Sequence, residues 1–177
     1  MRRFFAASVT ISALSALVVA PVFLLPDAAS AYPTGTNASY LGAGVSSGVT
    51  NGGKTGDAAT LGGNIQGRVA IPNTPISARG AILFSDETSA IMPLVSYDVP
   101  ITNNANVYVG AGYSFVEKNG KPTPLGNKDA VVLTTGVEAQ VTRDILIYSD
   151  AKLGIDAYEN SSGSAVSFQA GAAYRFR

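Results

Sequence analysis

The chain has 177 residues, of which 46% are hydrophobic and 14% charged, and it contains 19 glycines but no cysteine or histidine. This composition excludes disulfides, the usual zinc sites and nucleophiles activated by histidine. The 12 lysines and arginines balance the 12 aspartates and glutamates, so no basic excess indicates a nucleic-acid partner. The length suits a single domain.

The N-terminal residues have the pattern of a secretory signal. Arg2 and Arg3 precede an apolar run over residues 4–25, and the small residues Ala29 and Ala31 then form a cleavage site. An uncleaved membrane anchor is the alternative interpretation. Cleavage after Ala31 divides the chain into a signal peptide (1–31), a short N-terminal periplasmic segment (32–37) and one barrel domain (38–177).

Apolar residues alternate with polar or small ones through the rest of the chain, and this period of two predicts β-strands. The weakest of these segments contains Pro93, which removes a ladder donor, so we expect a β-bulge there. No segment shows a helical period. Eight strands are predicted, over residues 39–50, 61–71, 76–85, 90–99, 106–115, 130–141, 144–156 and 165–176.

The connections between these strands favour an all-β, eight-stranded antiparallel up-and-down barrel. The odd-numbered connections, such as 51–60 and 117–129, are on balance longer and more polar than the even-numbered ones, such as 142–143. Long and short connections at opposite ends are typical of transmembrane barrels. Alternation alone does not separate a membrane barrel, which is apolar outside, from a soluble lipocalin-like barrel, which is apolar inside.

The distribution of charge favours the membrane barrel. One face of the predicted strands carries no charge, whereas the other carries four positive and four negative side chains together with many glycines. Such a sparse, balanced set suits a crowded lumen better than a water-facing surface. The predicted lumen charge network consists of Arg68, Arg79, Asp98, Glu138, Asp150, Lys152, Asp156 and Arg175.

Aromatic residues on the apolar face lie near strand ends, which is the arrangement of two interfacial girdles. The outer girdle comprises Phe84, Tyr113, Phe115 and Phe168, and the inner girdle comprises Tyr97, Tyr174 and Phe176. Val109 belongs to the same lipid-facing side and Gly112 to the lumen side. We therefore expect Val109→Arg to block assembly and Gly112→Ser to be tolerated.

The C-terminal strand, AVSFQAGAAYRFR, resembles the strand by which outer-membrane barrel proteins are recognised for insertion, except that Arg177 follows the last aromatic residue, Phe176. Over residues 38–177 the chain resembles the small eight-stranded outer-membrane barrels typified by the OmpA transmembrane domain and OmpX. The resemblance implies a monomer in the cell outer membrane. It also implies contact with outer-membrane lipid and with the barrel-assembly machinery, through the C-terminal strand.

One motif suggests a different class of protein. Residues 48–55, GVTNGGKT, match the phosphate-loop pattern of nucleotide-binding proteins. That site requires a helix directly after the lysine, and the glycine-rich sequence GDAATLGG cannot support one. We therefore interpret residues 51–60 as an outer loop.

No catalytic, cofactor-binding or metal-binding residue is predicted, and we expect no enzymatic activity or cofactor, because the known enzymes among outer-membrane barrels depend on histidine. The predicted function is structural or a surface interaction through residues 51–60 and 117–129, with a lumen filled by side chains. A narrow porin-like channel and a soluble periplasmic ligand-binding barrel are the alternatives.

Overall fold

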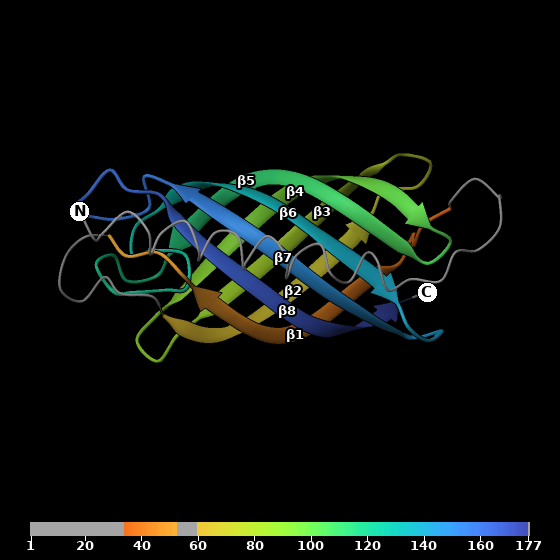
Figure 1. Cartoon of the computed structure of the whole chain (residues 1–177), viewed down its shortest axis with the longest axis horizontal. Coiled ribbons are helices and arrows are strands. Elements are labelled where there is room, and N and C mark those ends of the chain that lie inside the picture. The colour runs from red at the N-terminus through yellow and green to blue at the C-terminus, as the bar shows by residue number, and fades with distance from the viewer. Residues whose placement is uncertain (1–33, 53–59, 177) are drawn as a thin grey trace, which may run out of the picture.

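The computed structural model describes residues 34–52 and 60–176, which form a closed barrel of eight antiparallel strands (Figure 1). Each strand pairs with the next one, and β8 closes the barrel against β1. The strands are β1 Ser39–Gly48, β2 Leu61–Ala70, β3 Ile76–Phe84, β4 Ser89–Thr102, β5 Ala105–Val116, β6 Ala130–Gln140, β7 Ile145–Ile155 and β8 Ala165–Phe176. The predicted fold class and all eight predicted strands are confirmed.

None of the described residues forms a helix long and apolar enough to cross a membrane. The predicted signal peptide, the core of the phosphate-loop match and Arg177 lie outside the described residues.

The two ends of the barrel differ. Ser39 at the start of β1 pairs with Phe176 at the end of β8, and we call this end of the barrel the terminal end. The connections at the terminal end, 71–75, 103–104 and 141–144, are short. The opposite end, which we call the loop end, carries the longer connections 49–60, 117–129 and 156–164 together with the short 85–88.

The prediction of a β-bulge at Pro93 is wrong. Ile91 pairs with Phe115 and Leu94 with Gly112, so the register of β4 against β5 is the same on both sides of the proline. Proline removes one donor, but its fixed φ is compatible with an extended strand, and the missing bond alone does not move the register. The register shifts instead between Pro100 and Thr102, at the terminal rim, where bulges are common.

The two faces of the barrel wall have inverted polarity. In β3 exposure alternates strictly, with Ile76, Ile82 and Phe84 outside and Ser77 and Arg79 buried inside. The other strands also place large apolar side chains on the exposed outer face, among them Leu41, Val45, Ile91, Val109 and Ile147. An apolar exterior around a polar interior is the pattern of barrels that lie in lipid.

The interior is divided along the barrel axis. A cluster of buried apolar side chains lies in the half next to the loop end, beside buried polar residues such as Asn64, Ser114 and Ser167, and it comprises Ala81, Leu83, Met92, Leu94, Leu125, Ala130, Val132, Ala157, Tyr158 and Ala165. We call this cluster the apolar layer. Polar and charged side chains fill most of the other half, beside a small apolar cluster around Tyr40, Leu146 and Tyr148.

Candidate functional site

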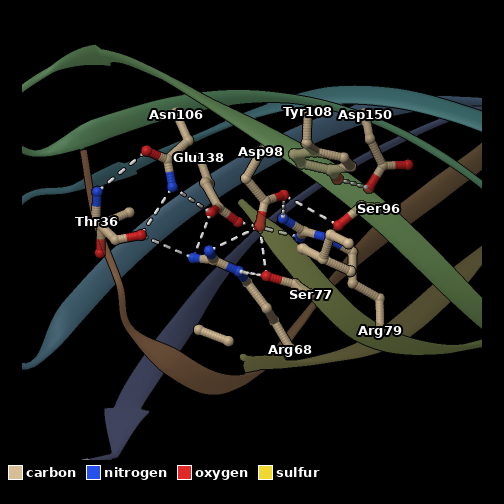
Figure 2. Close-up of polar contacts among 12 residues, drawn as sticks. Thr36, Arg68, Ser77, Arg79, Ser96, Asp98, Asn106, Tyr108, Glu138 and Asp150 are labelled. Carbon is tan, nitrogen blue, oxygen red and sulfur yellow. Dashed lines mark hydrogen bonds and ion pairs between the residues drawn. The ribbon is translucent and has the colours of Figure 1, made fainter. Parts of the chain in front are cut away.

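Four charged side chains from four strands meet in the terminal half of the lumen (Figure 2). The guanidinium of Arg68 lies 2.8 Å from Asp98 and 2.6 Å from Glu138. The guanidinium of Arg79 lies 2.9 Å from Asp98 and 3.1 Å from Glu138. Each arginine therefore bridges both carboxylates, and the four groups form a closed ring of ion pairs.

Strand register explains why this ring needs both carboxylates. Arg68 and Arg79 stand directly opposite each other in the ladder between β2 and β3, where like charges repel. Asp98 comes from β4, which is adjacent to β3. Glu138 comes from β6, which pairs with neither β2 nor β3. The ring thus ties together strands that share no backbone ladder.

Hydroxyl groups complete the coordination of the ring. The Ser77 hydroxyl accepts from Arg68 Nε at 2.9 Å and donates to Asp98. The Ser96 hydroxyl accepts from Arg79 Nε at 2.7 Å and donates to Asp98 Oδ1 at 3.0 Å. Buried charges are stable only when their remaining donors and acceptors also form hydrogen bonds. Ser77 and Ser96 form such bonds with the two arginines and with Asp98.

Two tyrosines extend the ring toward the centre of the barrel. The Tyr40 hydroxyl donates to Glu138 Oε2 at 3.0 Å and accepts from Arg79 Nη1 at 2.8 Å. The Arg79 guanidinium carbon lies 3.6 Å from the centre of the Tyr108 ring, a favourable cation–π position. The Tyr108 hydroxyl donates to Asp150 Oδ2 at 3.0 Å and so connects the ring to a second ion pair.

That second pair joins Lys152 Nζ to Asp150 Oδ1 at 2.6 Å, and both side chains are buried. Lys152 also donates to Gln66 Oε1 at 3.4 Å, and Gln66 donates in turn to the Tyr40 hydroxyl. Three cations and three anions are therefore buried in one connected set. We call Arg68, Arg79, Asp98, Glu138, Asp150 and Lys152 the lumen network.

The other two residues of the predicted charge set are not members of the lumen network. Asp156 follows the last residue of β7, adopts a φ of 54° and forms an exposed ion pair with Lys128 at 2.8 Å. Its position in the lumen was predicted by continuing the alternation past the end of the strand, and that prediction is wrong. Arg175 is half-buried on the inner side of β8 at the terminal rim, across the ladder from Tyr40, and it donates to Gln140 Oε1 at 3.0 Å.

Tyr40, Tyr108 and Tyr148 are buried on the lumen face. The predicted charge network does not include them, although the sequence contains a signal for Tyr108 and Tyr148. Tyr108 pairs across the ladder with Gly136, and Tyr148 pairs with Gly171. A Cβ on Gly136 would lie 2.7 Å from the Tyr108 ring, and one on Gly171 would lie 2.5 Å from the Tyr148 hydroxyl. A lumen tyrosine opposite a glycine thus marks a position where a narrow barrel accommodates a large ring.

The aromatic residues assigned to girdles lie on the outer face in two bands. Phe84, Tyr113 and Phe115 are exposed near the loop end, and Tyr97, Tyr174 and Phe176 are exposed near the terminal end, whereas Phe168 is half-buried. Two close pairs occur within the bands. The ring centres of Tyr113 and Phe115 are 4.9 Å apart, and those of Tyr174 and Phe176 are 6.1 Å apart.

Comparison with known proteins identifies the fold. No family model and no curated protein sequence matches the chain. Solved structures that are similar to the chain over nearly their whole length include those of three natural proteins. They are Neisserial surface protein A (15% identity, 78% of this chain and 97% of the other, TM-score 0.56), the N-terminal β-barrel domain of Pseudomonas aeruginosa OprF (12%, 80% and 98%, 0.54) and Ail, the attachment invasion locus protein of Yersinia pestis (15%, 79% and 99%, 0.51).

A de novo designed transmembrane β-barrel is similar to the same extent, with 11% identity and a TM-score of 0.54 over 80% of this chain and 98% of the other. At these identities the similarity concerns the path of the backbone. The chain therefore has the fold of the small eight-stranded outer-membrane β-barrels.

Proposed function

We propose that this protein is a non-enzymatic barrel of the bacterial outer membrane, with a structural role and a surface for interactions at its loop end. The observation that carries this proposal is the inverted polarity of the barrel wall. Its apolar outer face lies between two aromatic bands, as expected for a wall in contact with lipid. In this orientation the terminal end faces the periplasm and the loop end faces outward.

We further propose that the lumen is closed to solutes. Support comes from the apolar layer, in which Leu83, Met92 and Val132 are fully buried. Leu125 and Tyr158, from connections 117–129 and 156–164, are buried in the same layer. An eight-stranded barrel has an interior just wide enough for side chains to fill, and a packed apolar layer leaves no hydrated path for ions.

Hydrogen bonds between described residues of the connections hold the loop end in a defined shape, as an interaction surface requires. Asn127 N donates to Ala157 O at 3.0 Å, and Glu159 N donates to Asn127 Oδ1 at 2.9 Å. The hydroxyls of Thr50 and Tyr158 lie 2.9 Å apart. These bonds join Thr50 and the connections 117–129 and 156–164 into one platform. We assign this platform a surface role by similarity to a protein named for attachment and one named as a surface protein.

Cell fractionation tests the proposal. The protein should be recovered with outer membranes, and its migration on a denaturing gel should change after boiling, as expected of a barrel that stays folded in detergent until heated. A control with the lipid-facing Val109→Arg change should lose the folded band. Recovery of the unaltered protein in the soluble periplasmic fraction would instead support a soluble ligand-binding barrel and would refute the proposal.

A further inference from the structure

The N-terminal segment that precedes β1 enters the mouth of the barrel at its terminal end. Thr36 is only 2% exposed, although it lies outside any strand. Its backbone is bound by the side-chain amide of Asn106 from β5, as Figure 2 shows. Thr36 N donates to Asn106 Oδ1 at 3.1 Å, and Asn106 Nδ2 donates to Thr36 O at 2.7 Å. One side-chain amide thus pairs with both polar groups of one residue's backbone.

Further bonds to the segment also reach its backbone. Arg68 Nη1 donates to Thr36 O at 2.9 Å and to Ala38 O at 3.3 Å. Gly35 N donates to Thr102 O at 3.0 Å. The Thr36 hydroxyl accepts from Ala38 N, which belongs to the same segment. The hydrogen bonds from the barrel to the segment therefore go to its backbone and not to the Thr36 hydroxyl.

Gly35 is the position where the segment's sequence does matter. It adopts a φ of 65°, a conformation that favours glycine. A Cβ at this position would lie 2.0 Å from Asn106 Oδ1 and 3.0 Å from Pro100 Cβ. A side chain here would therefore push the segment away from the amide that binds it.

We propose that the terminal mouth is a binding site for peptide backbone, formed by Asn106 and Arg68, and that the chain's own residues 35–38 occupy it. The occupied site also supports the lumen network, because Asn106 Nδ2 lies 3.0 Å from Glu138 Oε1 and Arg68 pairs with Glu138 and Asp98. A hollow of about 590 Å³ lies beside the segment, lined by Asn37, Pro72, Pro100 and the two binding residues among others. Arg68 and Asp98 of the lumen network also line this hollow, so the bound segment lies where the hollow meets the network.

The absence of cysteine from the chain allows a direct test. Single variants Thr36→Cys and Asn37→Cys, made in the full-length protein and folded in detergent, are labelled with a polar maleimide. Residue 36 is buried and residue 37 is exposed, so the thiol at 36 should react at least about tenfold more slowly, since it reacts only when the segment opens. Slow labelling at 36 also shows that the threonine side chain is not needed for binding.

Two changes should release the segment by different routes. Asn106→Ala removes the amide, and Gly35→Ala displaces the segment while leaving every barrel residue in place. Combined with Thr36→Cys, each should raise the labelling rate to that of Asn37→Cys. Asn104→Ala, which alters an exposed turn at the same end, is the matched control and should leave labelling slow.

A shift of the band on boiling shows for each variant that the barrel is folded. If Asn106→Ala does not fold, Gly35→Ala still tests the site, because residue 35 lies outside the barrel wall. Fast labelling at position 36 in the otherwise unaltered protein would overturn the proposal. So would slow labelling in a folded release variant.

Discussion

The two halves of the lumen are stabilised mainly by different kinds of contact. The half next to the loop end contains the apolar layer, with side chains such as Leu83, Met92 and Leu125. The terminal half contains the ring of Arg68, Arg79, Asp98 and Glu138 from the lumen network, in which every charge is matched by an opposite one within 3.1 Å. Both halves are buried, yet they stabilise the barrel in different ways.

The difference lies in what each half tolerates. An apolar layer depends on volume, so a side chain of similar size replaces another at small cost. A buried ionic ring depends on completeness, because removal of one partner leaves another charge buried without compensation. The terminal half should therefore respond to the loss of a single charge more strongly than the loop-end half responds to a conservative exchange.

The largest effect is expected from Glu138→Ala, which leaves Arg68 and Arg79 each with one carboxylate where they had two. The free energy of unfolding should fall by about 3–5 kcal/mol, measured by urea titration of the barrel folded in detergent. Glu117→Ala removes a carboxylate that binds Ser89 at the exposed loop end and should cost less than about 0.5 kcal/mol. Equal losses for the two variants would contradict a special role for the ring.

The next effect concerns the apolar layer. Leu83 is fully buried, so Leu83→Ala should reduce the free energy of unfolding by about 2–5 kcal/mol through the lost contacts and the cavity left behind. Leu83→Met keeps the volume and should cost less than about 1.5 kcal/mol. If the methionine variant loses as much as the alanine variant, the layer does not behave as a volume-dependent core, and the contrast with the terminal half disappears.

A third change tests the outer surface that both halves share. Val109 is 55% exposed on the outer face of β5, and Val109→Arg should cost about 2–4 kcal/mol near the bilayer midplane. The folded fraction in lipid vesicles measures this effect. Folding of the variant at the level of the unaltered protein would show that the face assigned to lipid is wrong.

The smallest effect is expected at the exposed ion pair between Lys128 and Asp156. Both side chains are more than a third exposed, and such pairs contribute about 0–1 kcal/mol. Lys128→Ala should therefore change the urea midpoint little, in contrast to Glu138→Ala. A loss comparable to that of Glu138→Ala would show that burial does not distinguish the two kinds of ion pair.

The faces of the barrel follow from sequence because alternation is a local property. Once β2 is registered, Arg68 must face the lumen and Val69 the exterior, as the structure has them. The same reasoning failed at Asp156, because a turn with positive φ ends the alternation. Strand ends depend on the connections that follow them, and alternation contains no information about these.

The contacts within the lumen were less predictable, because they join residues that are distant in sequence. Tyr40 meets Glu138, 98 residues away, and Thr36 meets Asn106, 70 residues away. Gly112 illustrates the same limit. Serine at this position was expected to be tolerated, but an added Cβ would lie 2.1 Å from the backbone oxygen of Pro93. The face was assigned correctly, whereas the space available on it depends on the neighbouring strand.

Recording of ionic current across a planar lipid bilayer tests most directly whether the apolar layer closes the barrel. The intact protein, inserted and folded, should give no current steps above those of the bare bilayer. The double variant Leu83→Ala with Met92→Ala, which thins the apolar layer, should give measurable steps and serves as the control for insertion. Stable current steps from the intact protein would contradict the account, since they would require a hydrated path through the layer.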